Sequence, residues 1–237
     1  MAITDTSPTE TSRGSRLSAL WLPVTYTYAA ILVLVTAVLA FVNDSTATRF
    51  VLHVSTNLHN LSNGHFGTLF ASAFVIDGAV VAAFILPGLI CLLALAERRF
   101  GALTLIRTFI AGHIGATILV ALGLWISVAT DWMPRNITMA EDVGVSYGAM
   151  AIVGALVSIL PAHRRTAWVV VWLGLASGGV IFGQTFTNVG HVLALSLGLA
   201  YGYFRQHRHP HPIHPLNRWE FALLAIGSGL SAMILLG

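Results

Sequence analysis

The chain has 237 residues, of which 56% are hydrophobic and only 9% are Asp, Glu, Lys or Arg. A soluble domain carries about 25% charged residues, so this composition excludes an ordinary water-soluble domain. It also excludes a disordered chain, which combines low hydrophobicity with high charge. The net charge is only +3, all 12 basic residues are Arg, and the single Cys91 has no partner for an intramolecular disulfide. We therefore predict an all-α polytopic membrane protein.

Seven stretches of the sequence are apolar enough to be membrane spans. A helix needs about 20 mostly apolar residues to cross a bilayer, and its backbone groups must be hydrogen-bonded within the helix because lipid offers them no partner. In chain order, the expected spans are 22–42, 79–96, 103–128, 144–160, 167–182, 189–204 and 219–236.

The distribution of Arg predicts the orientation of these spans. With the N-terminus inside, ten Arg fall in inner segments and only Arg49 and Arg135 fall in outer ones. This is the positive-inside pattern of a multi-pass protein with a cytoplasmic N-terminus. Residues 1–20 lack the pattern of a signal peptide, so we expect a disordered cytoplasmic tail before a transmembrane core at 21–204 and a last helix at 219–237. The all-Arg composition favours a bacterial origin, and hence the cell membrane.

Two connecting segments are unusual. The outer segment 43–78 is long and moderately apolar, and we expect it to form short amphipathic helices that lie in the membrane interface. The segment 205–218 is basic and rich in His and Pro. We interpret it as a cytoplasmic loop that contacts anionic lipid headgroups, since its prolines favour an extended chain without a fixed metal geometry. We expect no metal, no organic cofactor and no nucleic-acid partner.

Polar residues inside membrane spans are costly and therefore candidates for function. Ser146 lies near the start of the fourth expected span and His191 near the start of the sixth. Both spans begin on the outer side, so the two side chains are expected at about the same depth, at about 1.5 Å per residue. A histidine can accept the proton of a serine hydroxyl and make it a nucleophile. The alternative is structural: Ser146 bonds its own helix backbone and His191 makes one interhelical bond.

Small residues indicate that these two helices pack closely. They recur at about every fourth position, which lets helix backbones approach each other in a membrane. In the sixth span they are Gly190, Ala194 and Gly198, and in the fourth they include Gly144 and Gly148.

The pairing of Gly144-x-Ser146 with His191-x6-Gly198 resembles the rhomboid family of intramembrane serine proteases. The segment Glu97-Arg98-Arg99-Phe100-Gly101 is similar to that family's Glu-x-Arg-x-Gly segment. The resemblance implies a six-helix core, here followed by a seventh helix. It also implies that Ser146 is the nucleophile, that His191 is the general base, and that the Ser146 backbone N–H forms part of the oxyanion hole.

The sequence also departs from that family at two places. Tyr147 follows the serine where the family usually has Gly, and the family's His-x3-Asn in the second helix falls on Val81 and Ile85, which donate no hydrogen bond. Loss of one oxyanion donor costs about a hundred- to thousandfold in rate. The leading prediction is an intramembrane serine protease that cleaves transmembrane substrates through Ser146 and His191. The alternative is a catalytically weak or inactive rhomboid-like protein that binds transmembrane clients without cleaving them.

Three further residues have predicted roles near this site. Asp142 and Tyr147 are candidates for orienting His191 or capping the fourth helix, and a carboxylate such as Asp142 is favourable at a helix N-terminus. His113 is expected in the inner half of the third span, too far away to join Ser146 and His191 directly. We expect it to make an interhelical bond. The alternative is a proton relay in a small transporter, a class that would need more polar residues at mid-membrane.

Overall fold

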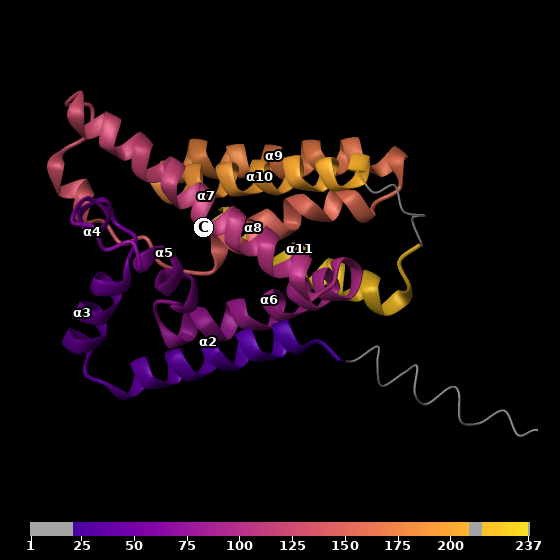
Figure 1. The fold of residues 1–237 in the computed structure, drawn as a ribbon, viewed down its shortest axis with the longest axis horizontal. Coiled ribbons are helices and arrows are strands. Elements are labelled where there is room, and N and C mark those ends of the chain that lie inside the picture. Colours follow the sequence, from indigo (N-terminus) through magenta and orange to yellow (C-terminus); the bar gives the residue numbers. More distant parts are fainter. Residues whose placement is uncertain (1–20, 209–214, 237) are drawn as a thin grey trace, which may run out of the picture.

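The computed structural model describes residues 21–208 and 215–236, and these contain helices but no strand (Figure 1). In chain order the elements are α2 (Pro23–Phe41), α3 (Asp44–Val54), α4 (Leu58–Ser62), α5 (Thr68–Ala71), η1 (Ser72–Phe74), α6 (Ala79–Phe100), α7 (Ala102–Ala129), η2 (Arg135–Met139), α8 (Ser146–Ala155), η3 (Leu156–Ile159), α9 (Ala162–Gly183), α10 (Phe186–Arg208) and α11 (Arg218–Leu236).

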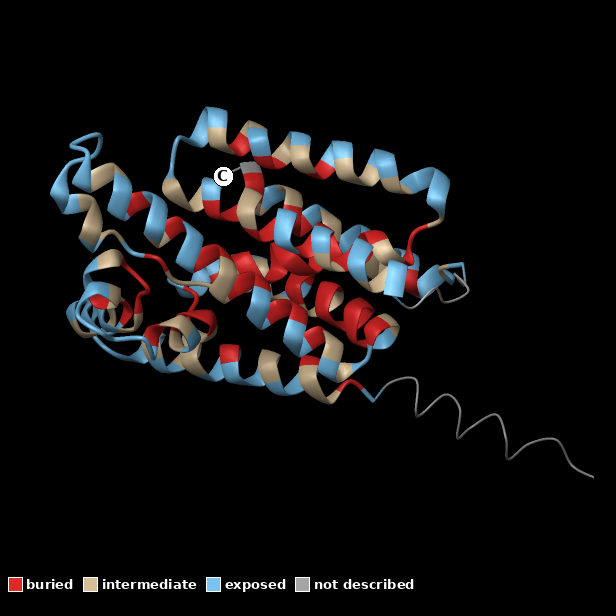
Figure 2. Ribbon diagram, turned by 45° about the horizontal axis from the view of Figure 1, so that its top comes forward, coloured by how far each residue is buried: buried red, intermediate tan, exposed pale blue. Residues whose placement is uncertain are grey.

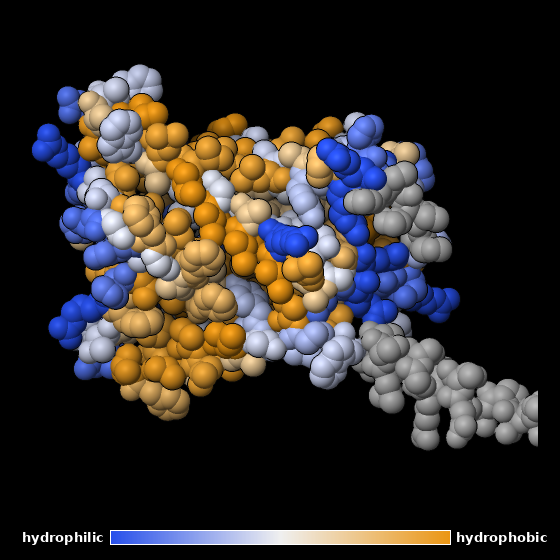
Figure 3. Space-filling model, in the orientation of Figure 1, coloured by the Kyte–Doolittle hydropathy of each residue, from blue (hydrophilic) through white to orange (hydrophobic). Residues whose placement is uncertain are grey.

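The long helices run roughly side by side, and the short helices α3 and α4 lie at one end of the bundle (Figure 1). Among the described residues, α2, α6, α7, α9 and α11 are long and apolar enough to cross a membrane. Figure 3 shows a broad hydrophobic band on one face, with hydrophilic residues toward both ends. This is a multi-pass membrane protein. The count of seven spans stays a prediction, because α8 is short and α10 carries several polar residues.

Helix α8 lies at the centre of the bundle, and nine of its ten residues are buried (Figure 2). Small residues make its contacts with α7 and α10 possible. A methyl group at Gly198 of α10 would overlap the backbone carbonyl of Ala151, and one at Gly154 of α8 would overlap that of Leu195. On the other side, a methyl group at Gly112 of α7 would overlap the Ala151 side chain. Of the small residues predicted to allow close packing, Gly198 therefore lies between α8 and α10, whereas Gly148 faces Phe109 of α7.

The segment between α2 and α6 forms the short helices α3, α4, α5 and η1. Asn43 and Asn57 cap α3 and α4, since their side chains accept the backbone N–H groups of Thr46 and Asn60. This segment is tied to the chain that leads into α8, because the Gly144 N–H donates to the Ser72 carbonyl at 2.9 Å. Gly144 itself has φ = +120°, a conformation that a residue with a Cβ adopts only with strain.

The last turn of α6 holds two other helices in place. Glu97 is 5% exposed and caps α2: its carboxylate accepts the N–H of Val24 at 3.1 Å, the N–H of Thr25 at 2.8 Å and the Thr25 hydroxyl at 2.7 Å. Arg99 donates to the Glu220 carboxylate of α11 at 2.9 Å. The Glu97–Gly101 segment that resembles the rhomboid family therefore joins the first and last described helices to α6.

Helix α11 packs against both α6 and α9. Its Gly227 lies against Leu92 of α6, and a methyl group at Gly179 of α9 would overlap the Leu235 carbonyl. Helix α11, the predicted seventh span, is therefore an integral part of the bundle.

Candidate functional site

Ser146 is the first residue of α8, and His191 lies in the second turn of α10. His191 is only 4% exposed, whereas Ser146 is partly exposed. Neither ring nitrogen of His191 has a hydrogen-bond partner among the residues that the structure describes. The two predicted catalytic residues thus lie on neighbouring helices, but no hydrogen bond joins them.

Tyr147 is the residue of α8 that meets His191. The two rings are 5.5 Å apart between centroids and stand edge to face, at 79°. Tyr147 is 2% exposed, and its ring lies over Gly190, where a methyl group would overlap it. Successive residues of an α-helix point about 100° apart around the axis. Since Tyr147 points toward α10, the neighbouring Ser146 is turned to a different side of α8.

The ring of His113 in α7 lies on the other side of Tyr147. Its centroid is 6.3 Å from that of Tyr147 and 6.4 Å from that of Phe109. Its Nε2 lies 3.1 Å from the Ser72 hydroxyl oxygen of η1, so the expected bond between elements is confirmed. His113 does not contact His191 itself. Tyr147 connects the two histidines through ring contacts, an arrangement that sequence depth alone does not indicate.

Asp142 is hydrogen-bonded to an earlier segment of the chain. Its N–H donates to the Ser55 hydroxyl at 2.8 Å, and its carbonyl accepts the N–H of Thr56 at 3.0 Å. Asp142 therefore fastens the α3–α4 connection to the chain before α8. Val145, the residue directly before α8, makes no side-chain capping bond, and capping of this helix by Asp142 stays a prediction. Burial raises the pKa of the Asp142 carboxyl to about 6, although the nearby hydroxyls of Tyr147 and Thr56 act to lower the pKa.

We expect this carboxyl to make stability depend on pH. Because its folded-state pKa lies above the ordinary value, the folded state binds the proton more tightly than the unfolded state. This contribution to stability is fully present below about pH 4 and is lost as the pH rises through about 6. A shift of about two pKa units corresponds to about 3 kcal/mol.

Thermal melts of the wild type and of Asp142→Asn, in detergent between pH 4.5 and 7.5, measure this effect. As the pH rises, the melting temperature of Asp142→Asn is expected to increase relative to that of the wild type. The exposed Asp44, replaced by Asn, serves as the matched control. A difference that stays constant over this range would contradict the role of the Asp142 carboxyl.

The two positions expected from the sequence to correspond to the family's oxyanion donors carry apolar side chains. Val81 is 48% exposed on α6, and Ile85 packs at the edge of the core. Among residues 21–208 and 215–236, no three His, Cys, Asp or Glu side chains gather into a group that could hold a metal ion. Part of the predicted His- and Pro-rich loop, residues 209–214, lies outside the described residues.

A model of the rhomboid-like protein family matches residues 20–209. The chain belongs to the rhomboid-like protein family. The match spans α2 to α10, and therefore the helices that contribute Ser146, Tyr147 and His191 to this rhomboid-like core. No curated protein and no solved structure matches the chain.

Within this rhomboid-like core, the small residues predicted from the sequence do two things. Gly190 makes room for the Tyr147 ring against His191, and Gly148 makes room for the Phe109 ring of α7. Ala194 is fully buried, and Gly198 lets α10 approach the α8 backbone. These residues set the spacing of the helices around the candidate site.

Proposed function

We propose that this rhomboid-like protein binds transmembrane helices of other membrane proteins without cleaving them. The observation that carries the proposal is the contact between Tyr147 and His191. A general base must reach the proton of its nucleophile within about 2.6–3.2 Å or through one water molecule. Here the Tyr147 ring lies against the His191 imidazole, and neither His191 nitrogen hydrogen-bonds to a described residue.

The apolar side chains at Val81 and Ile85 support the same proposal. A tetrahedral intermediate carries a negative charge on its oxygen, and donors aimed at that charge are the largest single source of stabilisation in acyl transfer. Two apolar side chains at these positions supply no such donor. Proteolysis through Ser146 and His191 is the second candidate function. It is favoured by family membership and by the neighbouring helices that carry the two residues.

The face of α9 that is turned away from the bundle supports the proposal that this protein binds other helices. Trp172, Ala176 and Gly179 are buried, so the opposite side of α9 is turned away from the bundle. On that side, a methyl group at Gly174 or Gly178 would meet no atom within 4 Å. Two small residues four apart permit a second helix to pack closely in a membrane.

Labelling with a serine-directed fluorophosphonate probe, in lipid nanodiscs, tests the absence of hydrolysis. Wild type, Ser146→Ala and His191→Ala are compared beside an active rhomboid protease as positive control. We expect no labelling of the wild type while the protease is labelled. Labelling of the wild type that disappears in both variants would establish a reactive serine and replace this proposal with the second candidate.

Photo-crosslinking in cells tests client binding. A photoreactive amino acid at the exposed Val171 of α9 is compared with one at the exposed Leu119 of α7, and adducts are identified by mass spectrometry. Adducts at Val171 are expected to be membrane proteins joined through a transmembrane segment, and Gly174→Leu should reduce them at least threefold. Equal adducts at both positions that Gly174→Leu leaves unchanged would contradict binding at this face.

A further inference from the structure

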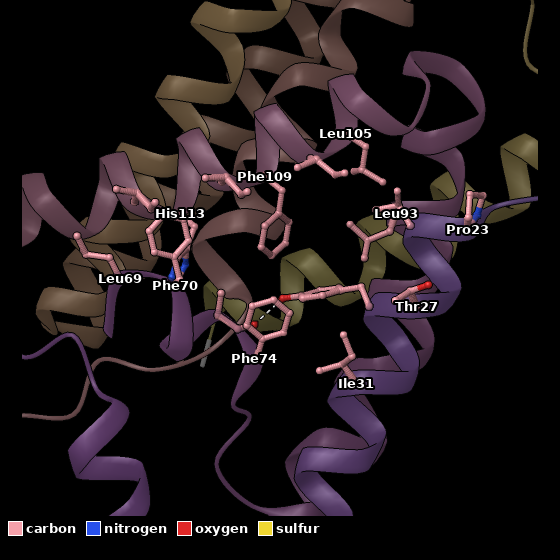
Figure 4. A pocket seen from close by; sticks show the side chains of 16 residues that line it. Pro23, Thr27, Ile31, Leu69, Phe70, Phe74, Leu93, Leu105, Phe109 and His113 are labelled. Atoms are coloured by element: carbon pink, nitrogen blue, oxygen red, sulfur yellow. Dashed lines mark hydrogen bonds between the residues drawn. The ribbon is translucent and has the colours of Figure 1, made fainter. Parts of the chain in front are cut away.

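A cavity of about 430 Å³ lies where α2, α5, η1 and α7 meet (Figure 4). This volume is within the range of about 300–1,000 Å³ for small-molecule sites. Its walls are almost wholly apolar, and the Tyr28 hydroxyl that reaches it already donates to the Ala73 carbonyl at 2.6 Å. The cavity is open at the side, because the lining residues Ile31, Phe70 and Ile106 are each exposed by more than a third. It is therefore suited to an apolar ligand that arrives through the bilayer.

The position of the cavity along the helices indicates the length of its occupant. Its lining on α7 runs from Leu105 to Ile114, which is about 13.5 Å at 1.5 Å per residue. This is roughly half of the hydrocarbon thickness of about 30 Å. One end lies at Pro23, next to the exposed Trp21, and Trp side chains favour the headgroup level. The cavity thus extends from one membrane surface to about mid-membrane.

Side chains of α5 line the far end of the cavity. Leu69 and Phe70 of α5 lie beside His113 of α7 at the end opposite Pro23 (Figure 4). A client helix about 10 Å wide that crosses the whole bilayer would collide with this end. A single acyl chain from one leaflet ends near mid-membrane and meets no such obstacle.

Arg107 supplies a charge beside this apolar cavity. It directly follows the lining residue Ile106 and precedes the lining residue Ile110 by three positions, so at about 100° per residue it lies at the edge of the lining stripe. It is exposed and has no hydrogen bond or ion pair within the part of the chain that the structure describes. Arg107 lies about 7.5 Å from the start of α7. From there its long side chain reaches the headgroup region.

We propose that this cavity binds one acyl chain of a phospholipid and that the lipid phosphate pairs with Arg107. An apolar seat for the chain and a cation at headgroup level together match the two parts of such a lipid. The cavity is not lined by Ser146 or His191. A test of lipid binding is therefore independent of the test of the proposed function.

The test uses the full-length protein in nanodiscs that contain a trace of phosphatidylglycerol with a photoreactive diazirine in one acyl chain. After illumination, adducts are located by fragmentation mass spectrometry. We expect them at Ile110, His113 and Ile114 at least five times as often as at Ile118 and Leu122, which are exposed on the same helix outside the cavity. Equal frequencies at both sets would mean ordinary annular lipid and would overturn the proposal.

Two variants test the two halves of the site. Ile106→Trp fills the mouth of the cavity and should lower the cavity adducts at least fivefold. Ile118→Trp, at another exposed position of the same helix, should not. Arg107→Gln should lower them at least threefold, whereas Arg164→Gln, an exposed Arg on α9, should not. No response to Ile106→Trp would overturn the cavity as the seat, and no response to Arg107→Gln would overturn the phosphate contact.

Two further experiments distinguish a phospholipid from a lipid without phosphate and from free phosphate. A photoreactive diacylglycerol with the same chains but no phosphate should give at least threefold fewer cavity adducts than phosphatidylglycerol. Inorganic phosphate at millimolar concentration should not compete, because it lacks the chain. Competition by inorganic phosphate would contradict a lipid as the occupant. Size-exclusion profiles and melting temperatures confirm that each variant is folded.

Discussion

Replacing Gly198 by Leu is expected to prevent formation of the folded bundle. A methyl group at this position of α10 already overlaps the backbone carbonyl of Ala151 in α8, and a backbone atom cannot turn aside as a side chain can. Overpacking in a core costs about 1–3 kcal/mol, and more where the backbone must move. We expect the effect at Gly198 to exceed 3 kcal/mol.

Gly123 of α7 provides the matched control, since a methyl group there would meet no atom within 4 Å. Both substitutions replace Gly by Leu in a long helix, so they gain equally in helix propensity. Yield of monodisperse protein and melting temperature in detergent give the comparison. Gly198→Leu should yield aggregate or no folded protein, and Gly123→Leu should behave as wild type. Similar melting temperatures for the two variants would show that α8 and α10 are not packed as closely as described.

Replacing Glu97 by Ala is expected to release the N-terminus of α2 from the end of α6. The carboxylate accepts hydrogen bonds from two backbone N–H groups and one hydroxyl, and all three lose this partner in the variant. Hydrogen bonds to a charged group contribute about 1.5–3 kcal/mol each, but water at the end of the helix replaces part of them. We expect a loss of about 3 kcal/mol in stability.

Melting temperature in detergent measures this loss, and protease sensitivity of α2 locates it. Glu141→Ala removes an exposed carboxylate from a loop and should leave both measurements unchanged. Thr25→Val removes only the hydroxyl bond and should have a smaller effect than Glu97→Ala. A Glu97→Ala protein as stable as wild type would show that α2 is held by apolar packing alone.

The class of the protein follows from composition. A chain with 9% charged residues and several apolar stretches of about 20 residues can satisfy its backbone groups in lipid only as helices. The resemblance in Glu97–Gly101 and in the pair Ser146 and His191 also indicated the family, which the match to residues 20–209 confirms. The Gly spacing in the fourth and sixth spans predicted their close packing. Residues about four positions apart lie on the same face of a helix, so small residues at this spacing let two helices approach each other.

The contacts around His191 depended on the tertiary structure. Depth along a helix follows from counting residues, so Ser146 and His191 were expected at one level. Which side chain of α8 meets His191 depends on how α8 is rotated about its own axis. Close contacts with α7 and α10 at Gly112, Gly154 and Gly198 fix that rotation. That rotation brings the Tyr147 ring against His191.

The contacts of Asp142 and His113 also depended on the tertiary structure. Sequence position next to α8 favoured Asp142 as a cap, and the structure adds hydrogen bonds to Ser55 and Thr56, in a segment more than 80 residues earlier. His113 meets Tyr147 because α7 and α8 cross closely at Gly112. The sequence by itself determined the class and the family. It did not determine the level of His113, which was expected in the inner half of its span but lies against Ser72 of the segment 43–78 and against Tyr147, next to Ser146. The tertiary structure decided which polar residues meet, since that depends on the packing of neighbouring helices.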